Sequence, residues 1–253
     1  MKKVFINPGH TPQNDIDAGR DWDVGAVGNG LQENIVAKEV ADLLQEELKN
    51  FGVDVVGNFQ SMSLYAITDN ANATAADVFV SIHCNSAGSS SANGTETFYC
   101  QGSSTGKKLA ECVQRHLVAE MKTFDRGVKD DTQTQHQRIH VLRASKMPAI
   151  LIELAFLSNE NDAELLRNRK SDFAKAIAKG LAEYFGISQK ISPDIVDKPV
   201  DLRFKNISEV PDWAKSTIQK LVDKKYLSDA NNLDLSLDMI RIFVINDRAK
   251  LYD

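Results

Sequence analysis

Four polar residues of this sequence stand at the edges of segments that otherwise have the apolar character of buried elements. His83 and Glu153 each follow an apolar run, and His10 follows the Asn-Pro-Gly segment at 7–9 after the first such run. Glu33 stands where a helix is expected to begin. Two imidazoles and a carboxylate can bind zinc through nitrogen and oxygen at roughly 2.0–2.2 Å and leave a fourth position for water. A second carboxylate nearby is then the natural general base, so these residue types permit a catalytic zinc site.

Each of the four residues also has a purely structural interpretation. A histidine at a strand end, such as His10 or His83, is more often a hydrogen-bonded structural residue. Glu33 in a first helical turn would interact favourably with the helix dipole. Glu153 is harder to explain in this way, because a carboxylate that ends an apolar run is costly to bury without a partner. The separations of 23 and 50 residues between the candidate ligands match no local zinc motif, so spacing alone leaves the site open.

The segments that must position these residues alternate between short β-branched runs and helical periods. This alternation predicts an α/β domain with helices packed on a sheet. Strands are predicted at residues 4–7, 53–56, 78–82, 95–99 and 149–153. Helices are predicted from about residue 32 to the glycine at 52, at 104–124 and at 172–185. Ligands of open α/β sheets bind at the carboxyl ends of the strands, so His10, His83 and Glu153 are expected just past three such ends.

Four segments, in order, resemble the blocks of a known enzyme family. They are INPGH at 6–10, VGAVGNGLQE at 24–33, ADVFVSIHCNS at 76–86 and PAILIELAFLSN at 148–159. Over residues 3–186 the chain resembles the zinc-dependent N-acetylmuramoyl-L-alanine amidases, often called amidase type 3. The resemblance implies that His10, Glu33 and His83 bind one zinc ion and that Glu153 is catalytic. It also implies an α/β fold with a mostly parallel central sheet flanked by helices.

The same resemblance implies a substrate, which is the amide bond between N-acetylmuramic acid and L-alanine in bacterial peptidoglycan. Two alternatives remain open: a zinc hydrolase that cuts within the stem peptide, and a non-enzymatic wall-binding module with an inactive site. Asn85, His140 and Arg143 are candidate substrate contacts. His140 stands where the family usually has an aromatic residue, and the preferred interpretation is an ordinary exposed histidine.

Two further segments and two further histidines can also be interpreted from the sequence. Family members commonly have an arginine in the helix before the ADVFVSIHCNS block, and this chain has none at 64–72, which leaves a local ion pair in doubt. The Ser/Gly-rich segment 86–94 directly follows a candidate ligand, so it is expected to be a mobile loop that borders the substrate groove, with an inert connection as the alternative. His116 and His136 are interpreted as surface residues.

Composition excludes several other classes. The chain has 253 residues, of which 42% are apolar, enough to bury a full core. Its 30 Lys and Arg against 35 Asp and Glu give a net charge of −5, which argues against a nucleic-acid partner. Three cysteines without C-x-x-C spacing argue against a disulfide framework or a cysteine-based zinc cluster. No apolar run approaches the roughly 18 residues of a membrane span, so membrane insertion is not expected.

The amino terminus suggests a biological setting. Residues 1–3 lead directly into a short predicted strand, which is too short for the apolar region of a signal peptide. If residue 1 is the native start, synthesis in the cytoplasm without a signal peptide is expected. A wall hydrolase of this kind would fit a phage endolysin that reaches the wall after a holin opens the membrane. A host autolysin or sporulation amidase is the alternative.

The carboxyl-terminal part differs in charge and in pattern. Residues 187–253 carry 11 basic and 11 acidic side chains, so the net charge of −5 belongs to residues 1–186. A linker is predicted at 187–203 and a small α-helical domain at 204–253. Pro211 is expected in the first turn of one helix, and Ser236 is expected to cap another. The second helix is expected to bury an apolar face made of Met239, Ile242, Phe243 and Ile245.

The segment 208–221, with 239–241, resembles one S-layer-homology-like repeat that lacks the usual glycines after the first helix. This resemblance implies attachment to the cell wall. Homodimerisation through the carboxyl-terminal helices and simple stabilisation are the alternatives, because two short helices rarely bury enough area alone.

Overall fold

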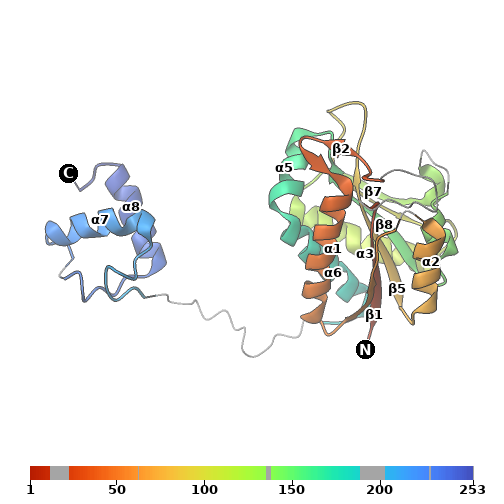
Figure 1. The fold of residues 1–253 in the computed structure, drawn as a ribbon, viewed down its shortest axis with the longest axis horizontal. Coiled ribbons are helices and arrows are strands. Elements are labelled where there is room, and N and C mark those ends of the chain that lie inside the picture. Colours follow the sequence, from red (N-terminus) through yellow and green to blue (C-terminus); the bar gives the residue numbers. More distant parts are fainter. Residues whose placement is uncertain (12–22, 62, 135–137, 189–202, 228, 253) are drawn as a thin grey trace. The chain divides into compact units, whose positions relative to one another are not determined.

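The computed structural model describes residues 1–11, 23–61, 63–134, 138–188, 203–227 and 229–252. The chain divides into two compact units, Met1–Lys190 and Ile191–Asp253 (Figure 1). His136 and residues 189–202 of the predicted linker lie outside the described residues. Among the described helices, none combines the length and the apolar character that crossing a bilayer requires.

The first unit is built on a six-stranded sheet with the order β4-β1-β5-β8-β6-β7. The strands are β1 (Lys3–Pro8), β4 (Asp54–Asn58), β5 (Val78–Asn85), β6 (Thr95–Tyr99), β7 (Asp125–Asp130) and β8 (Ala149–Phe156). All neighbouring strands are parallel except β6 and β8, which are antiparallel. The predicted mostly parallel sheet is therefore confirmed. A two-stranded antiparallel ribbon, β2 (Val27–Gly28) and β3 (Leu31–Gln32), lies outside it.

Helices cover both faces of this sheet (Figure 1). On one face, α1 (Glu33–Lys49), α3 (Ser104–Met121) and α6 (Lys170–Phe185) enclose the larger apolar core. On the other face, α2 (Leu64–Ala73) and α4 (His140–Ala144) enclose a smaller one. The alternation along β1 shows this division, because Val4 and Ile6 point into the larger core and Phe5 points into the smaller one. The other helices of this unit among the described residues are the 3-10 turn η2 (Asp131–Gln133) and α5 (Glu160–Asn168).

Several predicted elements differ from the observed ones. His83 and Glu153 were predicted to lie just past the ends of their strands. Strands β5 and β8 instead continue beyond these residues, so both lie within strands. Strand β7 was not predicted because its sequence, DRGVKD, contains no apolar run. As an edge strand it pairs on one side only, so it needs no continuous apolar character. Helix α3 ends at Met121 and not near 124, since Lys122 adopts a left-handed φ of 59°.

In the part that the structure describes, the second unit contains two helices, α7 (Asp212–Asp223) and α8 (Leu237–Arg248). Ser236 caps α8 as predicted, because its side chain accepts a hydrogen bond from Met239 N. Pro211 is the N-cap of α7 and not a first-turn residue. The small core consists of Val210, Ala214, Ile218, Leu221, Leu233, Leu235, Ile240 and Val244.

The predicted apolar face of α8 is wrong for Met239, Ile242 and Ile245, which are exposed, whereas Phe243 packs against the small core as predicted. Ile240 and Val244 are buried, whereas Ile242 and Ile245 are 55% and 64% exposed. The sequence of α8 is apolar on more than one side, so its periodicity did not distinguish the face that packs against α7 from the face that meets solvent.

Candidate active site

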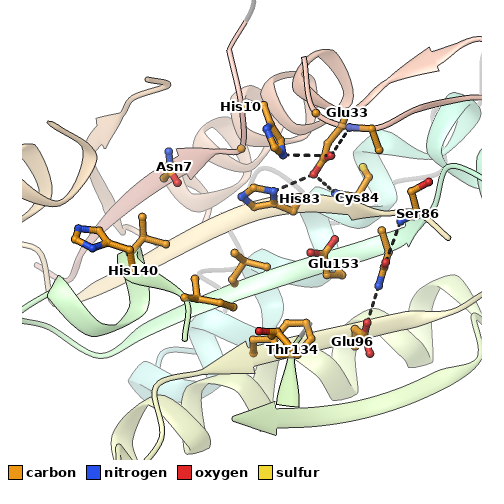
Figure 2. Close-up of a pocket in the computed structure, with 18 of the residues that line it drawn as sticks. Asn7, His10, Glu33, His83, Cys84, Ser86, Glu96, Thr134, His140 and Glu153 are labelled. Carbon is orange, nitrogen blue, oxygen red and sulfur yellow. Dashed lines mark hydrogen bonds and ion pairs between the residues drawn. The ribbon is translucent and has the colours of Figure 1, made fainter. Parts of the chain in front are cut away.

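Three side chains that lie far apart in the sequence meet above the sheet (Figure 2). His10 comes from the turn after β1, Glu33 is the first residue of α1, and His83 lies in β5. One nitrogen or oxygen atom from each of them lies within 4.8 Å of the others, which is close enough to hold a metal ion. No other such group of histidine, cysteine and acidic side chains occurs in the described part of the chain.

Two glycines allow this close approach. A Cβ atom at Gly9 would lie 2.3 Å from His83 Cε1. A Cβ atom at Gly25, whose φ is +68°, would lie 2.5 Å from both Glu33 Oε2 and His10 Cδ2. Any larger residue at either position would therefore displace a candidate ligand or strain the backbone.

Glu33 lies at the centre of the hydrogen bonds in this group. Its Oε1 accepts hydrogen bonds from Cys84 N at 3.1 Å and from His83 Nδ1 at 2.9 Å, and its Oε2 accepts one from Ala26 N at 2.8 Å. His10 Nε2 lies 3.2 Å from the same Oε2. Burial alone would raise the pKa of Glu33, but the hydrogen bonds and charges of the two histidines hold it far below its usual range. Glu33 is therefore ionised at neutral pH.

His10 contacts a second carboxylate on its other ring nitrogen. Its Nδ1 lies 2.7 Å from Asp23 Oδ1. Burial lowers the pKa of His10, but Glu33, followed by Asp23, outweighs burial and raises the pKa to about 9. A carboxylate in this position fixes the orientation of the ring and leaves Nε2 facing the other two candidate ligands. Sequence reasoning missed Asp23, although its place directly before the 24–33 block was an available signal.

Glu153 lies on the neighbouring strand. In the register of β5 and β8, His83 is paired directly with Glu153. Glu153 Oε2 is buried and has no hydrogen-bond partner among the described residues. Burial, with added repulsion from Glu33 and Glu96, raises the pKa of Glu153 well above its usual value. The pKa values of these two carboxyl groups are thus shifted in opposite directions. This suits Glu33 to bind a cation and Glu153 to exchange a proton.

These residues open onto a cavity of about 770 Å³. Its wall includes two of the candidate substrate contacts, Asn85 and His140, but Arg143 is exposed on α4 and is not part of the wall. Ser86, Ala87 and Ala92 of the Ser/Gly-rich segment border the cavity, as expected.

The interpretation of His140 as an ordinary exposed histidine is wrong. His140 is half-buried, and its ring packs edge-on against Tyr65 with the centroids 4.7 Å apart. Its Nε2 is buried without a hydrogen-bond partner in the described residues. The substrate-binding roles of Asn85, His140 and Arg143 remain predictions. His116, by contrast, is a partly exposed residue whose Nε2 lies 2.8 Å from Glu183 Oε2, between α3 and α6.

The sequence model of one family, described as N-acetylmuramoyl-L-alanine amidase, matches residues 4–183. The N-acetylmuramoyl-L-alanine amidase LytC of Bacillus subtilis (strain 168) is 36% identical over 189 residues, which cover 72% of this chain but only 35% of LytC. The endolysin of Bacillus phage SPP1 is 32% identical over 198 residues, covering 73% of this chain and 71% of the endolysin.

Solved structures show the same likeness. The catalytic domain of CwlV, an N-acetylmuramoyl-L-alanine amidase from Bacillus (Paenibacillus) polymyxa var. colistinus, superimposes with a TM-score of 0.64 at 32% identity. The match covers 74% of this chain and 100% of that domain. An N-acetylmuramoyl-L-alanine amidase from Clostridium difficile 630 gives a TM-score of 0.64 at 31% identity, covering 73% of this chain and 97% of that one.

Proposed function

Since the chain belongs to the N-acetylmuramoyl-L-alanine amidase family, we propose that it hydrolyses the amide bond between N-acetylmuramic acid and L-alanine in bacterial peptidoglycan. One zinc ion, bound by His10, Glu33 and His83, is its proposed cofactor. The observation that carries the proposal is the meeting of these three side chains within 4.8 Å, beside the buried carboxyl group of Glu153.

The donor set fits zinc. Two imidazole nitrogens and one ionised carboxylate are donors that zinc accepts, and catalytic zinc sites commonly use three protein ligands. Asp23 supports His10 from behind, as outer carboxylates do for metal-binding histidines. A bound zinc ion supplies Lewis acidity, which polarises a carbonyl group and makes water more acidic.

Glu153 is the proposed proton carrier. Its Oε2 is free of hydrogen bonds to described residues, so it can accept a proton from the attacking water and donate one to the departing L-alanine nitrogen. Its raised pKa favours the first of these transfers, because a carboxylate that is buried beside the charges of Glu33 and Glu96 takes up a proton more readily. The cavity walls hold the substrate so that both transfers occur at one side chain.

Purified peptidoglycan provides the test. Digestion should release free amino groups of L-alanine, and a chelator should abolish this release until zinc is restored. New termini from within the stem peptide would show instead the alternative zinc hydrolase. A protein that pellets with the wall but releases no termini at all would be the wall-binding module with an inactive site.

Two biological settings fit this activity. The phage endolysin is our proposed role, supported by the 32% identity to the SPP1 endolysin, with release to the wall assisted by a holin. A host autolysin or sporulation amidase is the alternative, and the 36% identity to LytC supports it equally well. The time at which the protein is made distinguishes them: production only during phage lysis supports the endolysin, and production during growth or sporulation of uninfected cells supports the host enzyme.

A further inference from the structure

A second group of charged side chains, Glu96, Arg126 and Lys129, lines the same cavity. Figure 2 shows Glu96 on the far side of Glu153 from the three candidate ligands. The centre of this group is Glu96 of β6, which is only 4% exposed. Glu96 Oε1 accepts a hydrogen bond from Asn85 Nδ2 at 2.5 Å. Its Oε2 accepts one from Arg126 Nε at 3.1 Å and another from Lys129 Nζ. One buried carboxylate thus orders an amide and two cations.

The two cations outnumber the carboxylate that holds them. Arg126 and Lys129 are both on β7, and their side chains are 30% and 29% exposed. The guanidinium of Arg126 lies over the ring of Phe156, with its Cζ 4.8 Å from the centroid, and the ammonium of Lys129 lies 6.0 Å from the ring centroid of Phe98. Such contacts hold a cation in place without neutralising it. This wall of the cavity therefore carries a net positive charge.

Both cations keep donors for a ligand. Among the described residues, Arg126 uses Nε for Glu96 and Nη1 for the carbonyl oxygen of Asn93 at 3.3 Å, which leaves Nη2. Lys129 donates to Glu96 alone among the described residues, and an ammonium group has three donors. A guanidinium beside an ammonium is suited to bind a carboxylate.

The sheet register places this group relative to the chemistry. Glu153 of β8 is paired with His83 of β5 on one side and with Glu96 of β6 on the other. Because neighbouring strands lie about 4.8 Å apart, Glu96 is one strand from the proton carrier and two strands from the nearest candidate ligand. A substrate whose carbonyl group lies at the ligands, with its departing nitrogen at Glu153, extends its amine-side portion toward β6 and β7. In the proposed reaction this portion is the stem peptide.

We propose that Arg126 and Lys129, positioned by Glu96, bind a free carboxylate of the stem peptide on the amine side of the scissile bond. The proposal rests on the proposed amidase function. In peptidoglycan the second stem residue is a glutamate linked through its side chain, and its α-carboxyl group is either free or converted to an amide. This subsite prefers the free acid, because a carboxamide brings no charge to two cations that share one counter-ion.

Two soluble disaccharide muropeptides that differ only in this group, carboxylate or carboxamide, test the proposal. Calorimetry on the zinc-loaded Glu153→Gln variant measures binding without turnover, and wild-type protein is assayed on both compounds in parallel. Arg126→Gln and Lys129→Gln, each added to Glu153→Gln, remove one cation. Arg115→Gln is the matched control, because Arg115 pairs with Glu183 between α3 and α6 and does not line the cavity.

The carboxylate compound should bind about tenfold more tightly, the scale of one charge-assisted hydrogen bond. Either cavity substitution should remove most of this preference, and Arg115→Gln should retain it. Equal dissociation constants for the two compounds, or a preference that survives both Arg126→Gln and Lys129→Gln, would overturn the subsite. If wild-type protein released L-alanine amino groups from neither compound, the proposed function would fail, while the binding comparison would still decide the subsite.

Discussion

The two units of the chain place their apolar residues differently. In residues 1–190 the large side chains of the core, such as Phe5, Phe79 and Phe173, are almost fully buried, and the candidate site is built on the strands and helix ends that this core supports. Among the described residues of 191–253, eight apolar residues are buried, but Trp213 and Ile242 are about half exposed. A rigid core can hold polar groups in one geometry. We therefore infer that the first unit carries the chemistry and the second contributes a surface.

The largest expected difference between the units is in the rate of peptidoglycan hydrolysis after substitution of one glutamate in each unit. Glu153→Gln should lower the rate of peptidoglycan hydrolysis by about 100-fold to 10,000-fold, because it removes a general acid and base. Glu209→Gln in the second unit should leave the rate unchanged, since Glu209 is exposed and, within the described residues, accepts hydrogen bonds only from Lys205 and Asn206 nearby in the chain. Loss of turbidity of a wall suspension measures both. Similar rates for Glu153→Gln and wild type would remove the distinction between the units.

The second effect is a difference in stability between substitutions in the core of the second unit and substitutions on its surface. Ile218→Ala should destabilise this unit by about 2–5 kcal/mol, because Ile218 is fully buried. Ile242→Ala on α8 should change stability by no more than about 0.5 kcal/mol, because its side chain is largely exposed. Urea unfolding of the full chain with Trp22 replaced by Phe, which leaves Trp213 as its single tryptophan, reports both values by fluorescence. Equal losses of unfolding free energy for the two variants would show that the face of α8 that carries Ile242 is covered in solution, as homodimerisation through these helices requires.

The third effect is a pH dependence confined to the first unit. Below about pH 9, metal-free His10 holds a proton that a zinc ion must displace, whereas Glu33 is already ionised. Zinc affinity should therefore fall about tenfold for each pH unit as the pH decreases below about 9. Calorimetry in buffers of different ionisation enthalpy counts the proton released. Asp23→Asn removes a charge that raises the pKa of His10. The zinc affinity of this variant should therefore begin to fall only at a lower pH than that of wild type. Zinc binding without proton release at pH 7 would contradict this account.

The smallest effect concerns catalysis after removal of the second unit. Residues 1–190 alone should cleave soluble muropeptides at a rate within about twofold of the full chain, since all the candidate site residues belong to the first unit. The same truncation should pellet less with purified walls if residues 204–253 serve cell-wall attachment. Unchanged pelleting would exclude attachment and leave dimerisation or stabilisation. A large loss of activity on soluble compounds would show that the units share the chemistry.

Much of the site could be predicted from the sequence because its main residues interrupt apolar patterns. Glu153 ends an apolar run, and His83 follows one, so both stand out where a core residue is expected. The helix-covered sheet followed from the alternation of strands and helices, and its mostly parallel order was implied by the resemblance to the amidase family. The structure brings His10 and Glu33 to the same place, although no local spacing indicated it.

The remaining features carry no such pattern. Arg126 and Lys129 belong to β7, an edge strand whose charged sequence resembles a surface loop. Asp23 acts only through the ring of His10, a contact that depends on tertiary structure. Helix α8 has apolar residues on several sides, so the buried face was set by its packing against α7 and not by its own periodicity.

We infer that the three candidate ligands, His10, Glu33 and His83, form one hydrolytic site with Glu153, in which the ligands and Glu153 have separable roles. Zinc content and new L-alanine amino termini, measured together on purified peptidoglycan for wild type, His83→Ala and Glu153→Gln, test it most directly. We expect one zinc ion and abundant termini for wild type, neither for His83→Ala, and one zinc ion with almost no termini for Glu153→Gln. Abundant L-alanine termini from Glu153→Gln, or from His83→Ala without zinc, would contradict it.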